Sequence, residues 1–331
     1  MLIDWFNFLE KLTFRKIINY LKNKVAYFLS VIFQKPVILG YPSVASIEPI
    51  NSCNLKCPEC PVGNDLMTRS TGAIETSLYR KLIDELSPRL SYLMLYFMGE
   101  PLLHPQFISL IEYSTSKKIY TVTSTNGHFL NIQYAKEIVK SGLDRLIVSM
   151  DGIDQESYEK FRQHGDFNRV IEGIANVVQM KQKLRSRVPY IILQFIAMRH
   201  NEKQINEIKR TGKRLGADKI VVKSLQVKDF SRNAKLIPEN KKFSRYKKGK
   251  DNKYIIKKKL QNHCRRLWET MVILNDGCIV PCCFDKDGEF VFGRYPENGI
   301  YDLWKGMQFN LFRQRILNSR KDIEMCCNCI E

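Results

Sequence analysis

Between residues 44 and 225 the sequence alternates six strand patterns with amphipathic helical patterns, and this alternation restricts the fold more than any other feature. Six such steps at short spacing predict parallel strands joined by crossover helices, in a sheet that is open or curved. We expect an α/β fold with a partial (β/α)6 parallel barrel, whose reactive residues lie at the C-terminal ends of the strands. The predicted strands span residues 44–50, 91–97, 119–124, 145–150, 190–198 and 219–224.

The ten cysteines form two groups, three within residues 53–60 and seven within residues 264–329. The first residues of the chain lack the basic segment and cleavage site of a secretory signal, which predicts a location in the reducing cytoplasm. Clustered thiols in that compartment are typical of metal ligands rather than of disulfides. The two groups therefore predict two metal centres.

The first group, Cys53, Cys57 and Cys60, directly follows the first predicted strand. Three thiolates leave one position of a metal centre open, as catalysis requires, and they favour zinc, copper or iron–sulfur clusters. Spacing alone also allows a zinc knuckle that is completed elsewhere, or three buried thiols. Because residues 99–100 and 124–126 follow the next two strands, we expect them at the same edge of the sheet.

The order Cys53-x3-Cys57-x2-Cys60 resembles the signature of the radical S-adenosylmethionine (SAM) superfamily, and the resemblance extends over residues 46–225. It implies that the three thiolates hold a [4Fe–4S] cluster whose fourth iron chelates the amino and carboxylate groups of SAM. It also implies that an electron from the reduced cluster cleaves SAM to a 5′-deoxyadenosyl radical, which abstracts hydrogen from a substrate.

Further positions match this family in order. Met98-Gly99-Glu100-Pro101 resembles its Gly-Glu-Pro element, which implies that Glu100 accepts hydrogen bonds from the SAM amino group, although Met98 replaces the first glycine of the usual pair. Arg162 either reaches the SAM carboxylate or lies on a solvated helix face. The sequence identifies no catalytic acid or base. The other residues that resemble elements lining the SAM ribose and the substrate chamber, or form ordinary strand-to-helix turns, are Ser124, Asn126, Ser149 and Asp151.

The second cysteine group resembles the auxiliary-cluster domains called SPASM and Twitch, through the order C-x12-G-x4-C followed by C-x2-C. A full SPASM domain continues with more cysteines than follow here, so we expect the shorter, single-cluster form. The resemblance implies a second [4Fe–4S] cluster. Its expected ligands are Cys264, Cys282, Cys326 and Cys329.

Two alternatives remain for this second site. Cys283 or Cys327 could replace the ligand beside it, and the spacing does not separate an iron–sulfur cluster from a four-cysteine zinc site. Cys278, Cys283 and Cys327 are otherwise surplus and are expected to be buried thiols.

The formal net charge of +19 favours anionic partners. Residues 1–43 are predicted to be an amphipathic helical extension that lies on an anionic membrane surface or packs against the catalytic domain or a partner, and they do not span a membrane. Residues 226–262 form a basic linker, in which aromatic residues could stack on nucleic-acid bases. The remaining divisions are the barrel, 44–225, and the auxiliary domain, 263–331.

The predicted function is a radical SAM oxidoreductase or maturase that uses SAM and two [4Fe–4S] clusters, the auxiliary cluster taking an electron from the substrate. The substrate is expected to be an anionic or polar sugar, polyol, peptide or protein, and a flavodoxin or ferredoxin is expected to be the reductant. The alternative is a non-catalytic iron–sulfur or zinc protein for electron transfer or nucleic-acid binding.

Overall fold

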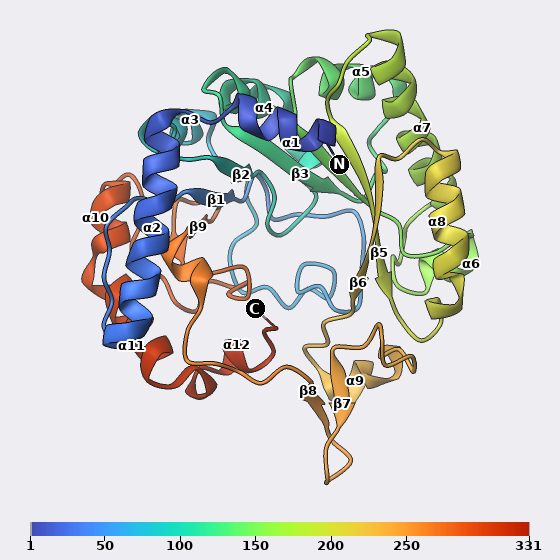
Figure 1. The fold of residues 1–331 in the computed structure, drawn as a ribbon. Helices are drawn as coiled ribbons and strands as arrows, with labels where there is room; N and C mark the ends of the chain where they lie inside the picture. Colours follow the sequence, from blue (N-terminus) through green and yellow to red (C-terminus); the bar gives the residue numbers. More distant parts are fainter. Residues whose placement is uncertain (1, 331) are drawn as a thin grey trace.

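The computed structural model describes residues 2–330, which fold around one curved eight-stranded sheet (Figure 1). The strand order is β10-β9-β1-β2-β3-β4-β5-β6, and the pairs from β9 to β6 are all parallel. The predicted α/β class and open, partial barrel are confirmed. The six predicted strands are β1 (Val44–Ile47), β2 (Tyr92–Met94), β3 (Tyr120–Thr125), β4 (Arg145–Ser149), β5 (Tyr190–Ala197) and β6 (Lys219–Ser224).

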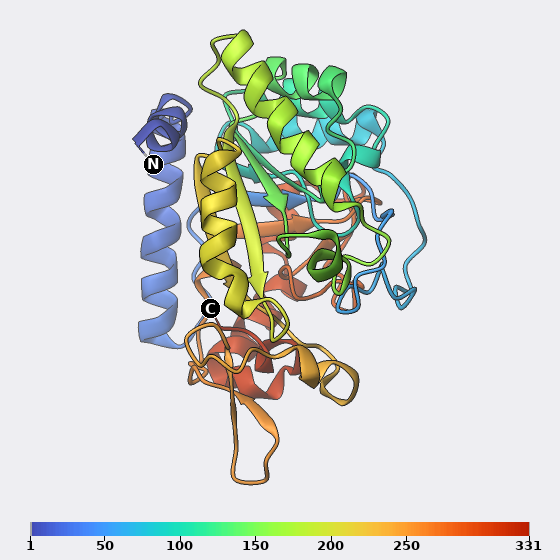
Figure 2. The ribbon, with the colours of Figure 1, turned by 90° about the vertical axis from the view of Figure 1, so that its right-hand side faces the viewer.

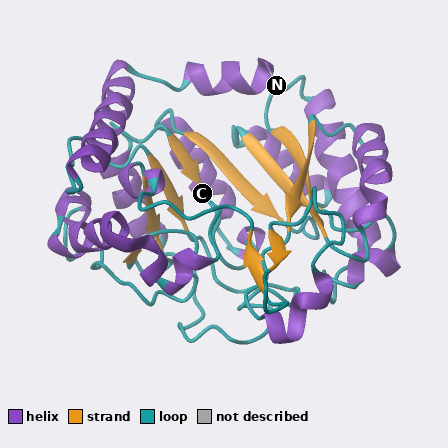
Figure 3. Cartoon of the chain, turned by 60° about the horizontal axis from the view of Figure 1, so that its bottom comes forward, coloured by secondary structure: helices purple, strands orange, loops and turns teal. Residues whose placement is uncertain are grey.

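Helices cover the outer face of the sheet (Figures 1 and 3). Each presents an apolar stripe to the strands, as α7 does by burying Val170, Ile174 and Val177. Asp166 caps the start of α7 by accepting hydrogen bonds from two main-chain N–H groups. The helices of this layer are α3 (Thr76–Leu86), α4 (Phe107–Ser116), α5 (Ile132–Lys140), α6 (Gln155–Glu159), α7 (Phe167–Lys183) and α8 (Ile205–Arg214).

Two N-terminal helices, α1 (Leu2–Glu10) and α2 (Phe14–Phe33), cover the N-terminal ends of the strands and form one side of the molecule (Figure 2). Asp4 of α1 accepts hydrogen bonds from the Tyr120 hydroxyl and the Arg145 guanidinium, at the starts of β3 and β4. No helix among residues 2–330 is long and apolar enough to cross a bilayer.

The C-terminal region extends the same sheet. Its strand β9 (Thr270–Ile273) pairs with β1, and β10 (Ile279–Val280) pairs with β9. The region predicted as a separate auxiliary domain therefore shares hydrogen bonds with the barrel, although the division into domains remains a prediction. It continues through α10 (Ile300–Lys305), α11 (Met307–Ser319) and α12 (Glu324–Cys327).

The basic segment predicted as a linker contains helix α9 (Phe230–Asn233) and a hairpin of β7 (Tyr246–Lys248) and β8 (Tyr254–Ile256). The Phe230 ring contacts the rings of Tyr246 and Tyr254. Since Tyr246 is buried in this cluster, its ring does not offer the exposed surface that base stacking needs. The short 3₁₀ helices of the chain are η1 (Pro101–Leu103), η2 (Glu202–Gln204), η3 (Ala234–Leu236), η4 (Arg265–Trp268) and η5 (Arg320–Asp322).

We predict that Asp4→Asn loosens α1 while leaving α2 in place. The substitution weakens a partly buried ion pair with Arg145, and a loss of about 2 kcal/mol would raise amide exchange roughly 30-fold. Hydrogen exchange read by mass spectrometry over residues 2–12 measures the effect. Glu10→Gln is the control, because the Glu10–Arg187 pair is exposed. Equal exchange in wild type and Asp4→Asn would show that the ion pair does not hold α1.

Candidate active site

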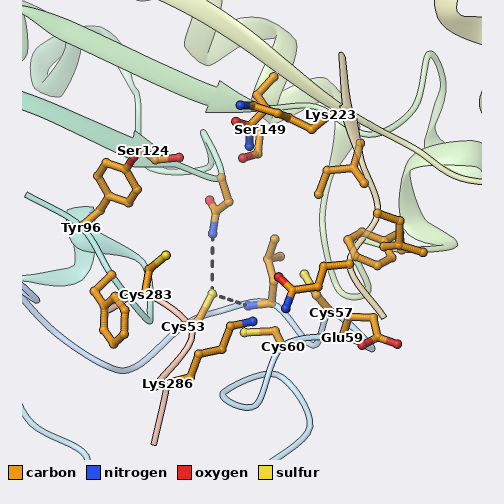
Figure 4. Close-up of a pocket in the computed structure, with 18 of the residues that line it drawn as sticks. Cys53, Cys57, Glu59, Cys60, Tyr96, Ser124, Ser149, Lys223, Cys283 and Lys286 are labelled. Carbon is orange, nitrogen blue, oxygen red and sulfur yellow. Dashed lines mark hydrogen bonds between the residues drawn. The ribbon is translucent and has the colours of Figure 1, made fainter. Parts of the chain in front are cut away.

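A cavity of about 530 Å³ lies inside the curved sheet, toward the C-terminal ends of the strands, and is here called the barrel cavity. All three thiols of the first cysteine group, Cys53, Cys57 and Cys60, line it (Figure 4). The strand-end residues Ser124 and Ser149 line it from the opposite side (Figure 4). The fold thus brings together residues that are almost a hundred positions apart in the sequence.

Gly99 fixes the chain just before the first thiol. Its φ is +74°, and an added Cβ would lie 2.5 Å from the carbonyl oxygen of Ile50 and 2.6 Å from that of Ser52. The Glu100 N–H donates to the Ser52 carbonyl at 2.8 Å. Only glycine permits this approach without strain. Met98, where the family has its other glycine, is buried, and the Gly99 contact forms without a glycine at that position.

Glu100 joins the ends of β2 and β3 through a fully buried carboxylate. It accepts hydrogen bonds from the Thr125 hydroxyl at 2.6 Å, the Asn126 N–H at 2.7 Å and the Leu102 N–H at 3.2 Å. Burial raises the pKa of Glu100 to about 7, against the opposing effect of these hydrogen bonds. The residue lines the barrel cavity, and two carboxylate oxygens can accept more bonds than these three.

Asn126 links this strand end to the cysteine loop. Its amide Nδ2 donates to Asn54 Oδ1 at 2.7 Å and lies 3.9 Å from the sulfur of Cys53. Gly99, Glu100, Ser124, Asn126 and Ser149 therefore all line one cavity with the first thiols, as their positions after the strands predict.

Asp151 is the exception among the predicted site residues, since it does not line the cavity. Its carboxylate is fully buried, accepts from Arg162 Nε at 2.6 Å and from the Ile196 N–H at 2.6 Å, and holds Arg162 in place. Arg162 lines the cavity instead, with Nη1 3.9 Å from the sulfur of Cys57. The oxygens of Asp151 face Arg162 and the main chain, and a contact between Asp151 and a cofactor stays a prediction.

Most of the cations in the barrel cavity were not singled out by the sequence patterns. Arg162, Lys223, Arg245, Arg266 and Lys286 line it, against two carboxylates. The sequence does contain a signal for Lys223. In a strand such as β6, every second side chain points to the same face, so the pattern can show which side chains face the inside of the barrel. Arg266 and Lys286 come from the C-terminal region, and no local pattern shows that this region closes the barrel.

A second, smaller cavity, called here the cysteine cavity, gathers the predicted auxiliary ligands Cys264, Cys282, Cys326 and Cys329. Cys283 lines both this cavity and the barrel cavity.

The other two surplus cysteines lie away from it. Cys278 is buried beside Asp276, as expected. Cys327 is exposed and donates to the Lys321 carbonyl at 3.0 Å, so the expectation that it is buried is wrong. The fold therefore brings the predicted four together with Cys283, and the choice of ligands among these five stays a prediction.

The donor sets fit iron–sulfur clusters chemically. Burial raises the pKa of the Cys53 and Cys326 thiols to about 11, so a bound cation is needed to keep them ionised. Among residues 2–330 no three His, Cys, Asp or Glu side chains converge on one point as ligands of a single metal ion do. A four-iron cluster has a different requirement, since each thiolate binds its own iron.

The model of the radical SAM superfamily matches residues 47–216, about half of the chain. The protein belongs to the radical SAM superfamily. The model of the SPASM iron–sulfur cluster-binding domain matches residues 264–330. These matches confirm the predicted cofactors, SAM with a [4Fe–4S] cluster and an auxiliary cluster. The single-cluster form of the C-terminal domain and the individual ligands remain predictions.

Relatives of this radical SAM enzyme include proteins that modify cofactors and peptides. A tungsten-containing aldehyde ferredoxin oxidoreductase cofactor-modifying protein from Pyrococcus furiosus is 24% identical over 293 residues, 81% of this chain and 82% of that protein. An AdoMet-dependent heme synthase from Methanosarcina barkeri is 30% identical over 134 residues, 40% of this chain and 38% of that protein. Streptococcus suis SuiB bound to SAM superposes with a TM-score of 0.63 at 15% identity, covering 83% of this chain and 68% of SuiB, which shows a shared fold.

We predict that Gly99→Ala releases iron from the first site and lowers the stability of the fold. A Cβ at positive φ, pressed against two carbonyl oxygens, costs about 2–3 kcal/mol and displaces the segment before Cys53. Iron content and thermal unfolding of the anaerobic enzyme measure both effects. In the control Gly249→Ala, the new Cβ would meet no atom closer than 3.3 Å. Full iron content in Gly99→Ala would contradict this role.

Proposed function

We propose that this radical SAM enzyme catalyses a two-electron oxidation of its substrate, with the auxiliary cluster as electron acceptor. The observation that carries this proposal is the position of the cysteine cavity. Five thiols line it, more than the four needed to ligate a cluster completely, and it shares Arg266, Cys283 and Phe284 with the barrel cavity. A cluster without an open iron suits electron transfer rather than substrate ligation.

When bound, the first cluster and SAM supply the 5′-deoxyadenosyl radical that removes a hydrogen atom, and the auxiliary cluster supplies an acceptor for one electron. The substrate thereby loses one hydrogen atom, one electron and one proton, so a hydroxylated carbon becomes a carbonyl. An external low-potential reductant, such as flavodoxin or ferredoxin, supplies the electron that starts each turnover.

The chain's own residues position SAM in this proposal. Cys53, Cys57 and Cys60 hold the first cluster, and Glu100 accepts from the SAM amino group with its remaining lone pairs. Arg162, held by Asp151, pairs with the SAM carboxylate. The burial of the Asp151–Arg162 pair supports this assignment, because a fixed guanidinium loses little freedom on binding.

The cationic side chains that line the barrel cavity support a substrate that carries an anionic group. Among the relatives, SuiB has been solved with a precursor peptide, and the Pyrococcus protein modifies a cofactor. Both classes of substrate, and a sugar or polyol with an acidic group, are compatible with the cations of Lys223, Arg245 and Lys286. We place the reaction in the reducing cytoplasm, where thiolate clusters persist.

We predict that Arg162→Met weakens SAM binding by about 10- to 100-fold, since it removes a charge-assisted hydrogen bond of about 1.5–3 kcal/mol. Asp151→Asn should weaken binding in the same direction by a smaller factor, because Arg162 stays but loses its orientation. Anaerobic calorimetry with SAM measures both affinities. Arg169→Met, at an exposed site on α7, is the control. Unchanged affinity in Arg162→Met would remove Arg162 from the SAM site.

We predict that Cys326→Ala lowers the iron content from about eight to about four atoms per chain. The variant should still cleave SAM but form no oxidised product, since it lacks the electron acceptor. Cys327→Ala is a matched control, because this neighbouring thiol is exposed and lies outside the cysteine cavity. Iron, sulfide and zinc analysis, with SAM-cleavage and product assays, measures the outcome. Zinc in the second site, or oxidised product from Cys326→Ala, would overturn the electron-transfer role.

A further inference from the structure

Helices α1 and α2 turn their apolar side chains outward. Their buried residues are mostly polar, including Asn19 and Asn23, which donate to the Tyr41 carbonyl, and Ser30, which accepts from the Trp268 indole. This is the reverse of a helix that packs on a protein core. Of 21 large apolar side chains that are exposed among residues 2–330, thirteen belong to these helices. They are Leu2, Ile3, Trp5, Phe6, Leu9, Phe14, Ile17, Tyr20, Leu21, Val25, Phe28, Ile32 and Phe33.

A patch of this kind marks an interaction surface, and its charge identifies the partner. Basic residues Arg15, Lys22 and Lys35 lie exposed on or beside the helices, and the whole chain carries a net charge of +19. Apolar and aromatic residues with cations around them are typical of helices that lie in the interface of an anionic bilayer. Because α1 and α2 together form one side of the molecule (Figure 2), both can touch a flat surface at once.

Beneath this surface lies a cavity of about 990 Å³, here called the basal cavity. It is enclosed by α1, α2 and the N-terminal ends of β1 and β2. Trp5, Leu9, Ile17 and Tyr20 line it and are also exposed, so the cavity opens within the apolar surface. Its interior is formed largely by apolar and aromatic groups, with Arg265, Arg266 and Glu269 on the side of the C-terminal region.

The basal cavity adjoins the barrel cavity. Arg266 lines both. Met94 lines the basal cavity and Tyr96 the barrel cavity, and side chains two residues apart point to the same face of an extended chain. The two cavities thus meet at Arg266, with a largely apolar lining on the basal side and the cations Lys223, Arg245 and Lys286 on the barrel side.

We propose that the substrate is an anionic amphiphilic lipid taken from a membrane surface. Helices α1 and α2 lie on the bilayer, the apolar tail occupies the basal cavity, and the anionic head reaches the cations of the barrel cavity. The inference rests on the proposed function, since it assigns the substrate class to the same site. It commits to a lipid because a free polar metabolite would leave both the exposed apolar surface and the basal cavity without an occupant.

Binding to the surface can be measured with vesicles of equal parts phosphatidylcholine and phosphatidylglycerol. The full-length holoenzyme is expected to sediment with them, and Leu21→Ser/Phe28→Ser to bind at least tenfold more weakly, because both side chains are more than half exposed on α2. Met307→Ser/Leu311→Ser is the matched control, since these residues are equally exposed on α11. The proposal is overturned if the wild-type enzyme does not sediment with the vesicles, as expected of an enzyme that acts on a peptide. Equal weakening of vesicle binding in both variants would also overturn it.

Entry of the tail can be measured separately with 9,10-dibromostearate, below its micelle concentration. Trp5 lines the basal cavity and is the only exposed one of three tryptophans, the other two being fully buried, so bromine in the cavity should quench its fluorescence. Val44 and Thr270 are paired across β1 and β9 in the wall of the basal cavity, so Val44→Phe/Thr270→Phe places two rings inside it. This variant should reduce quenching at least fivefold. Circular dichroism and iron content test whether it is folded. If the wild-type fluorescence is not quenched, or if a folded variant is quenched as strongly as the wild type, the proposal that the tail enters the basal cavity is overturned.

SAM cleavage by the same wild-type preparation separates this inference from the function on which it rests. Cleavage without vesicle or stearate binding would overturn the lipid substrate and leave the radical SAM reaction intact. Lipid binding by an iron-loaded enzyme that cannot cleave SAM would overturn the proposed function, and the substrate assignment with it.

Discussion

The buried carboxylate of Glu100 is the interaction on which the rest of the site depends. Its two oxygens bind the start of η1 and the end of β3, while its main chain binds the segment before Cys53. Three separate stretches of chain therefore meet at this one buried residue. Replacing such a group leaves several buried donors unpaired at once, which costs more than the loss of any single contact.

The pairing of β9 with β1 connects the two cysteine groups through one sheet. Cys264 and Cys282 flank β9 and β10, so the strands that complete the sheet edge also carry two thiols of the cysteine cavity. The same segment supplies Arg266 and Lys286 to the barrel cavity. A hydrogen-bonded sheet therefore sets the separation between the two cysteine groups. It is a stiffer connection than a flexible linker between domains would give.

Much of this architecture could be predicted from the sequence, because strand periodicity and the position of reactive residues after strands are local signals. The placement of Cys53, Glu100 and Asn126 in one cavity follows from that rule. The pairing of Asp151 with Arg162 could not be predicted, because a strand-end position does not show whether a carboxylate faces the cavity or a neighbouring arginine. The addition of β9 to the sheet has no local signal either, since it pairs residues that lie more than two hundred positions apart.

That long-range pairing also fixes the order in which the protein can mature during synthesis. The apolar helices α1 and α2 are made before the strand that covers the free edge of β1, which is synthesised only after residue 269. Until then β1 is an unpaired edge, open to association with other chains, and the contact between Ser30 and Trp268 cannot form. A ribosome stalled before residue 270 would therefore carry an unfinished barrel whose apolar helical surface is already exposed.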